Sequence, residues 1–151
     1  MTDNEQILLK IAKEIIDLNP GSSLTGSLML AVRGIPKRRE STDIDILIPN
    51  YAPNAILSNG EWIDKGYASD GSSQKYANSI GIRVDILSSD EEPELVGDVW
   101  CGSVDKMIEC KRSYYEHDIN AETKEKHLLD LLFLGVEIEQ SSIADVDKLP
   151  F

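Results

Sequence analysis

The stretch of sequence that decides the fold is LTGSLMLAVRGIPKRRESTDIDILIP, which runs from Leu24 to Pro49. Near its end, the segment TDIDILI alternates isoleucines with two aspartates, which is the two-residue period of a β-strand. Its first part, at positions 24–32, reads as a strand end that turns into a short helix, with a tight turn at Gly26 and Ser27 as the cap. We therefore expect a strand end, a short helix and a second strand in direct succession.

Helical patterns lie on both sides of this stretch. Thr2 followed by Glu5 has the form of a capping box, and apolar residues then recur at helical spacing until Asn19-Pro20-Gly21. Towards the C-terminus, Ser103 can cap one helix, and a leucine-rich helix follows from about Glu122 to Leu134. The sequence thus predicts one N-terminal helix and two C-terminal helices.

A second alternating pattern, at positions 82–87, predicts a strand that carries Asp85 on the face opposite its isoleucine and valine side chains. It follows a polar, Gly/Ser-rich and hairpin-like region at positions 64–79. These elements predict an α+β fold with a small mixed sheet flanked by helices. We expect a single domain that comprises a core with the sheet, a helical extension and a polar tail, at 1–100, 101–135 and 136–151.

Composition restricts the classes of partner. The 151 residues carry a formal net charge of -12, which repels nucleic-acid phosphates unless a local basic patch is present. Cys101 and Cys110 lack the spacing of a zinc site or a disulfide framework, so we interpret them as two buried thiols. The N-terminus has no secretory signal pattern and no apolar run is long enough to span a bilayer, so we expect a cytoplasmic protein without a membrane partner.

The aspartates carry the candidate chemistry. Asp43 and Asp45 project to the same side of their strand, where their charges repel each other unless a cation neutralises them. Mg²⁺ prefers oxygen ligands and completes its shell with water and substrate phosphate. Asp85, on another alternating strand, can bring a third carboxylate and help to hold a second ion. The pattern therefore predicts a magnesium site for phosphate chemistry.

Residues that suit phosphate binding surround this pattern. Gly26 lets the backbone approach a phosphate, and Ser27 offers a hydroxyl donor at the start of a helix. Arg39, with Lys37 and Arg38, adds cationic donors four residues before the first aspartate. In an acidic chain, this local excess of positive charge indicates a site for an anion.

In the order of its motifs, LTGSLMLAVRGIPKRRESTDIDILIP resembles the Gly-Ser motif and Asp-hydrophobic-Asp strand of the DNA polymerase beta-like nucleotidyltransferases, although the connector between the two is longer than the family's shortest spacing. The segment RESTDID is similar to the version in minimal and abortive-infection (AbiEii-like) transferases of prokaryotes, and IRVDIL resembles their third-carboxylate strand. The resemblance covers residues 24–87 and extends loosely to Lys111 and the KHLLDLLFL run. It implies a nucleotidyltransferase core at 1–100. In the family, the helices that follow this core vary with the substrate.

The resemblance also implies roles for individual residues. Asp43 and Asp45 would bind two magnesium ions, and Asp85 would complete the site and help to deprotonate the attacking hydroxyl. The phosphates of the nucleotide would be held by Gly26, Ser27, Arg39 and Lys111. The implied reaction moves a nucleoside monophosphate from a nucleoside triphosphate to a hydroxyl, with loss of pyrophosphate.

Several alternatives stay open. The acceptor is a tRNA, a protein side chain or a small molecule, contact with nucleic acid is undecided, and the toxin-like resemblance leaves room for an antitoxin-like protein partner. The alternative function is a noncatalytic nucleotide-sensing or interaction module that keeps the fold and its carboxylates. Taken singly, an Asp-x-Asp pair is usually a solvated strand face. The histidines, His117 and His127, suit surface or packing roles, whereas Tyr114 and Tyr115 only weakly suggest a base-stacking pocket.

Overall fold

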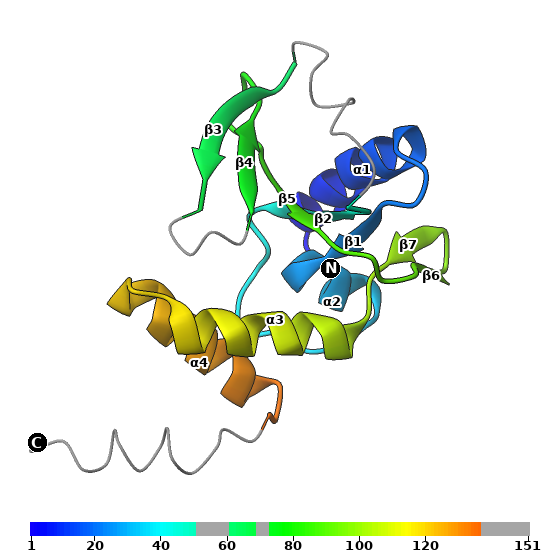
Figure 1. Ribbon diagram of the computed structural model, residues 1–151. Helices are drawn as coiled ribbons and strands as arrows, with labels where there is room; N and C mark the ends of the chain where they lie inside the picture. Colours follow the sequence, from blue (N-terminus) through cyan, green and yellow to red (C-terminus); the bar gives the residue numbers. More distant parts are fainter. Residues whose placement is uncertain (51–60, 69–72, 137–151) are drawn as a thin grey trace, which may run out of the picture.

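The computed structural model describes residues 1–50, 61–68 and 73–136 of the chain. Its architecture is α+β, with a mixed seven-stranded sheet, an N-terminal helix and two C-terminal helices. Figure 1 shows α1 on one side of the central strands and the α3–α4 pair on the other. The predicted fold class is confirmed, and the sheet is larger than the sequence patterns indicated.

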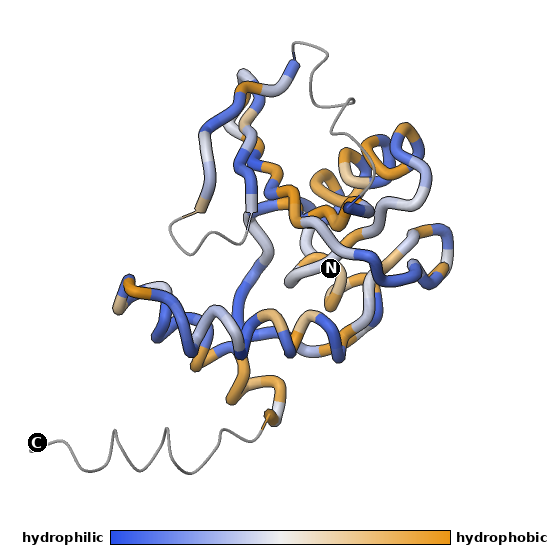
Figure 2. The backbone as a smooth tube through the Cα atoms, in the orientation of Figure 1, coloured by the Kyte–Doolittle hydropathy of each residue, from blue (hydrophilic) through white to orange (hydrophobic). Residues whose placement is uncertain are grey.

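The first helix, α1 (Asp3–Leu18), begins with the predicted capping box, in which the Thr2 side chain accepts from the Glu5 backbone and Glu5 accepts from the Thr2 backbone. Its inner face carries buried apolar side chains at helical spacing. Those side chains belong to the same core cluster as the apolar side chains of the central strands. Figure 2 shows hydrophobic positions along α1 and along the central strands. The helix therefore determines which face of the central strands is buried from solvent.

The decisive stretch folds as its sequence pattern predicts. Strand β1 (Ser23–Thr25) runs directly into α2 (Gly26–Val32), and β2 (Ile44–Ile48) returns antiparallel to β1. Strand β5 (Arg83–Ser88) lies parallel to β2 and pairs Asp45 with Asp85. The two predicted strands with acidic side chains are thus neighbours at the centre of the sheet.

Two further pairs of strands widen the sheet. Strands β3 (Ile63–Tyr67) and β4 (Gln74–Ala77) form the hairpin-like region and extend the sheet beyond β5. Strands β6 (Glu94–Val96) and β7 (Val99–Cys101), which the sequence analysis did not predict, extend it beyond β1. The resulting strand order is β3-β4-β5-β2-β1-β7-β6.

Both predicted C-terminal helices are present, and the predicted cap of the first one is confirmed. Ser103 caps α3 (Val104–His117) by accepting from the Lys106 backbone, and Asn120 caps α4 (Ala121–Phe133). Most of the expected polar tail, residues 137–151, lies outside the described residues. In the described part of the chain, no helix combines the length and the apolar character that crossing a bilayer requires.

The expectation of two buried thiols is wrong for one of them. Cys101 is buried on β7, but Cys110 lies on an exposed position of α3. Although residue Cys110 as a whole is exposed, partial burial of its thiol raises the pKa of that thiol, and burial also raises the pKa of the Cys101 thiol. Neither thiol is therefore prone to ionise at neutral pH.

Candidate functional site

A row of polar residues crosses the centre of the sheet. Thr25 of β1 is in register with Asp45 of β2, Asp45 with Asp85 of β5, and Asp85 with Lys75 of β4. Because residues at the same level of neighbouring strands point to the same face, these side chains share one side of the sheet. Asp43, at the bend before β2, is two residues from Asp45 and shares this side as well.

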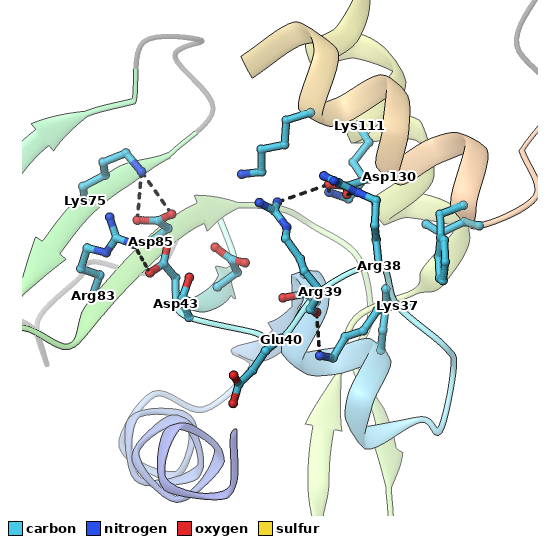
Figure 3. Close-up of a pocket in the computed structure, with 18 residues that line it drawn as sticks. Lys37, Arg38, Arg39, Glu40, Asp43, Lys75, Arg83, Asp85, Lys111 and Asp130 are labelled. Atoms are coloured by element: carbon cyan, nitrogen blue, oxygen red, sulfur yellow. Dashed lines mark hydrogen bonds and ion pairs between the residues drawn. The ribbon is translucent and has the colours of Figure 1, made fainter. Parts of the chain in front are cut away.

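This face opens into a cavity of about 350 Å³ between the sheet, α2, the segment at residues 37–43 and the C-terminal helices. Every residue that the sequence placed in the site lines it, namely Gly26, Ser27, Arg39, Asp43, Asp45, Asp85 and Lys111. Figure 3 shows two sides that face each other across the hollow. The sheet wall carries Asp43, Asp45, Lys75, Arg83 and Asp85, and the basic wall carries Arg38, Arg39, Lys111, Lys126 and Asp130.

Gly26 makes room for the carboxylate of Asp45. Its φ angle of +72° lies in the left-handed region, and a Cβ atom at this position would come within 2.1 Å of Asp45 Oδ2. Both observations require glycine here, since a side chain would strain the backbone and displace the carboxylate. The glycine predicted to admit a phosphate therefore has a first role within the protein itself.

Ser27 does not cap α2 as the sequence predicted. The N-cap is Thr25, which makes no side-chain capping bond, because Gly26 already begins the helix. The hydroxyl of Ser27 instead lies 2.8 Å from the hydroxyl of Ser41, on the segment that precedes β2. This hydrogen bond links the start of α2 to the chain just before Asp43.

The surroundings of Asp45 disfavour its charged form. Burial, followed by the neighbouring charges of Asp85 and Asp43, raises the pKa of Asp45 to about 7, although Lys111 and Lys126 oppose the shift. Among the described residues, the side chain of Asp45 has no hydrogen bond or ion pair. The raised pKa therefore reflects a carboxylate that is buried beside two other carboxylates.

The other two aspartates have cationic partners on the sheet wall. Lys75 Nζ lies 3.3 Å from both Asp85 oxygens, and Arg83 Nη2 lies 2.8 Å from Asp43 Oδ1 (Figure 3). That Asp43 oxygen is buried and accepts no hydrogen bond from the described residues, so its contact with Arg83 is an ion pair without hydrogen-bond alignment.

Three features of these aspartates suit a divalent cation. They present oxygen ligands, a buried oxygen of Asp43 accepts no hydrogen bond from the described residues, and burial disfavours the charged form of Asp45. Within residues 1–50, 61–68 and 73–136, however, no three His, Cys, Asp or Glu side chains are grouped as ligands of one ion. The pairs with Lys75 and Arg83 give the physical reason, since each turns a carboxylate towards a cation of the chain. The chemistry of these donors is that of a divalent-cation site, whereas in this structure Asp85 and Asp43 are arranged as partners of Lys75 and Arg83.

The basic wall is organised by a carboxylate that the sequence analysis missed. Asp130 of α4 lies 2.9 Å from Arg38 Nε, 3.2 Å from Lys111 Nζ and 3.6 Å from Arg39 Nη2. Their positive charges outweigh its burial and lower the pKa of Asp130. The expected cations Arg39 and Lys111 are therefore held together on one wall, although they come from distant parts of the chain.

Lys126 is a further residue of the cavity that the sequence analysis missed. It stands one helical turn before Asp130, at the i, i+4 spacing that places two side chains on one helix face, and this spacing was the available signal. Much of the side chain is exposed, yet partial burial of its ammonium, together with the charges of Arg39 and Lys111, lowers the pKa of Lys126. A group under such repulsion favours the approach of an anion.

Lys37 has a structural partner that the sequence did not indicate. Its ammonium pairs with the buried carboxylate of Glu5 and donates to the backbone oxygen of Arg39 at 2.9 Å. Burial alone would raise the pKa of Glu5, but its bonds with Lys37, Thr2 and Ser41 lower it to about 2. Lys37 thus anchors the segment before β2, and the remaining cations face the cavity.

A second cavity of about 300 Å³ adjoins the first and shares Asp45, Asp85 and Lys111 with it. Its wall includes Tyr114, whose ring centroid lies 5.4 Å from that of the buried His127. The expected packing role of His127 fits this contact. Of the two tyrosines considered for base stacking, only Tyr114 lines either cavity.

Comparisons with known proteins support the fold. No protein-family model matches the sequence, and no curated protein matches it significantly. The structure resembles that of JHP933 from Helicobacter pylori with a TM-score of 0.54 and 17% identity, over 89% of this chain and 67% of that chain. It also resembles a "putative nucleotidyltransferase from H. pylori" with a TM-score of 0.51 and 16% identity, over 89% of this chain and 69% of that chain. At such identities the likeness shows a nucleotidyltransferase-like fold and nothing about substrates.

Proposed function

We propose that this chain is a magnesium-dependent nucleotidyltransferase that moves a nucleoside monophosphate from a nucleoside triphosphate to a hydroxyl acceptor. One observation carries the proposal. Asp43, Asp45 and Asp85 converge with Gly26 on one cavity, directly opposite a wall of cations, in a chain of net charge -12. The structural likeness to a nucleotidyltransferase supports the same reading at the level of the fold.

Metal ions would be held by Asp43, Asp45 and Asp85, whose oxygens match the ligand preference of Mg²⁺. The chemistry that two such ions supply when bound is neutralisation of charge on the attacking and leaving oxygens. Asp45 is the carboxylate expected to gain most from this, because burial and the charges of Asp85 and Asp43 disfavour its ionised form more than Lys111 and Lys126 favour it. Gly26 leaves that carboxylate its space.

The protein residues position and neutralise the nucleotide. Arg39, Lys111 and Lys126 face the sheet wall and can balance the negative charge of the phosphates, including that of the departing pyrophosphate. Ser27 offers a hydroxyl at the first turn of α2. The acceptor oxygen attacks the α-phosphorus, the bond from that phosphorus to the β-phosphate oxygen breaks, and Asp85 takes the hydroxyl proton.

The acceptor is assigned by class alone, as a tRNA, a protein side chain or a small molecule with a free hydroxyl. The net charge of -12 opposes long contacts with a polynucleotide, so a nucleic-acid acceptor would have to contact the local basic wall or a basic partner protein. An antitoxin-like protein that regulates the chain belongs to the same proposal. Cell extract supplies all of these molecules in one experiment.

The second candidate is a noncatalytic nucleotide sensor. Arg83 pairs with Asp43 and Lys75 pairs with Asp85, and carboxylates paired with cations of the chain are weaker metal ligands, which favours a site that binds a nucleotide without transferring it. Such a module would keep the fold and its affinity for nucleotides. It would transfer nothing to any acceptor.

The test incubates the full chain with α-labelled nucleoside triphosphates, Mg²⁺ and cell extract, and follows labelled acceptors and pyrophosphate release. We expect transfer by the wild type and a loss on the order of 10³-fold in Asp43→Ala and Asp45→Ala. Asp17→Ala, which removes an exposed carboxylate of α1, is the matched control and should keep full activity.

Two results decide against the proposal. Nucleotide binding that depends on Mg²⁺, without transfer to any component of the extract, would assign the sensor function. Unchanged transfer by Asp45→Ala would remove the sheet wall from the chemistry. Thermal melting of each variant confirms that the fold persists before its activity is interpreted.

A further inference from the structure

Two cations of the sheet wall differ from the other described cations of the cavity, because they pair with aspartates of the sheet wall. Lys75 of β4 pairs with Asp85, and Arg83 of β5 pairs with Asp43 (Figure 3). Strand pairing makes the partners neighbours, since Lys75 is in register with Asp85, and Asp43 and Arg83 directly precede the registered residues of β2 and β5. A divalent ion that bound these carboxylates would therefore compete with Lys75 and Arg83 for the same oxygen atoms.

The remaining cations of the cavity are anchored elsewhere. Arg38, Arg39 and Lys111 converge on Asp130, and Lys37 pairs with Glu5. Arg38, Arg39 and Lys111 are therefore held by Asp130 of the basic wall and form no ion pair with the sheet-wall aspartates. Only the sheet-wall pairs, among the described residues, must open when the carboxylates take another cation.

The geometry of the two pairs permits such an exchange. The side chains of Lys75 and Arg83 are 42% and 62% exposed, so both can swing into solvent, whereas those of Asp85 and Asp43 are 13% and 28% exposed. Solvent screens an ion pair whose cation is exposed, so each of these pairs is held only weakly. A dication at the same oxygens gains more from the carboxylates and repels the ammonium and guanidinium groups.

We propose that Lys75 and Arg83 are exchangeable counterions of the aspartates, which a divalent cation displaces and which then bind a phosphate group on the sheet side of the cavity. The inference rests on the proposed metal site and adds a second anion site to it. Released cations beside a bound dication carry unbalanced positive charge, and a phosphate restores the balance. Metal and phosphate therefore strengthen each other's binding, and this coupling is reciprocal.

The first arm of the test titrates Mn²⁺ alone into the full chain at pH 8 and measures free Mn²⁺ by its spin-resonance signal. Lys75→Met and Arg83→Met lose a competing cation, so each should bind Mn²⁺ about tenfold more tightly than the wild type. Lys65→Met, which removes an exposed cation of neighbouring β3, is the matched control and should stay within about twofold. Lys75→Arg keeps the charge and should keep the wild-type affinity.

The second arm repeats the titration with inorganic phosphate. Phosphate should tighten Mn²⁺ binding to the wild type and Lys65→Met about tenfold, and to Lys75→Met and Arg83→Met about twofold at most. A final addition of phosphate after saturation with a nonhydrolysable triphosphate separates the two sources of the anion. If phosphate still binds beside the bound triphosphate, Lys75 and Arg83 contact a phosphate of the acceptor. If the bound triphosphate prevents phosphate binding, these cations contact the donor nucleotide.

The outcomes separate this inference from the proposed function. Equal or weaker Mn²⁺ binding by Lys75→Met and Arg83→Met would overturn the exchange, even in a chain that transfers nucleotides. Conversely, the expected affinities in a chain without transfer activity would uphold the exchange and remove the transferase. Both variants are expected to fold, because the side chains of Lys75 and Arg83 are exposed and lie outside the core. Melting curves of the variants verify this before the affinities are compared.

Discussion

The two faces of the central strands β2 and β5 differ more than any other two regions of the molecule. One face carries Ile44, Ile46, Val84 and Ile86, which are almost completely buried against α1. The other carries Asp43, Asp45 and Asp85 into the cavity. Because side chains alternate along a strand, stability and chemistry lie one residue apart on the same backbone. Substitutions at adjacent positions should therefore change different properties.

The largest effect is expected on the apolar face, at Ile46. This side chain is 0% exposed in the centre of the core, so Ile46→Ala should lower the free energy of unfolding by about 2–5 kcal/mol. Chemical denaturation measures the change. Affinity for Mn²⁺ below the transition should stay near that of the wild type, and a large loss of affinity would show that the two faces are coupled.

The next effect is expected on the polar face, at Asp45. The pKa of this group is about 7 in the folded chain and near its ordinary value of 3.8 in the unfolded chain, so the unfolded chain loses the proton first. Without metal, the stability of the wild type should fall as the pH rises from about 4 to about 7, and should stay low above that range.

Asp45→Asn has no charge at this position and should escape the loss. Its advantage should be absent near pH 3.5 and grow to about 2–4 kcal/mol at pH 8, as measured by urea unfolding in the presence of a chelator. Saturating Mg²⁺ should reduce the gap by stabilising only the wild type. A wild type that is more stable than the variant at pH 8 without metal would mean that a partner compensates Asp45.

A smaller effect on stability is expected from Gly26→Ala, which tests how closely the polar face is packed. The positive φ angle costs alanine about 1–2 kcal/mol, and the new Cβ must displace Asp45 Oδ2, which lies 2.1 Å away. Mn²⁺ affinity should fall at least about tenfold, which is more than the change in stability accounts for. Gly34→Ala is the control, because its φ angle is also +72° and no atom lies near its added Cβ.

Sequence alone predicts the features of this comparison that arise within one strand or one turn. The alternation in TDIDILI and IRVDIL, the capping box of Thr2 and Glu5, and the Gly26 turn are local signals, and the structure contains the corresponding elements. Parallel pairing of β2 with β5 then places Asp45 beside Asp85. Alternation cannot fix that register, because any even shift would also keep both aspartates on one face.

Features that depend on contacts between distant segments escaped the sequence analysis. Lys75 stands in a polar stretch without clear periodicity, and its role depends on the pairing of β4 with β5. Asp130 gathers Arg38, Arg39 and Lys111 from two other segments, and nothing local to α4 announces those partners. The short strands β6 and β7 gave too few residues for an alternating pattern.

The smallest effect is expected at Ser27, where the comparison can be sharpened to a single hydroxyl. Ser27→Ala and Ser41→Ala each remove one partner of the 2.8 Å hydrogen bond, so each should cost about 0.5–1.5 kcal/mol of stability. Only Ser27 lines the cavity. If its hydroxyl also contacts phosphate, Ser27→Ala should weaken Mg²⁺-dependent ATP binding about tenfold, whereas Ser41→Ala should weaken it about twofold at most. Calorimetric titration of both variants gives the comparison. Equal losses would assign Ser27 to the support of the segment before β2, and the phosphate contact would then pass to the cations of the basic wall.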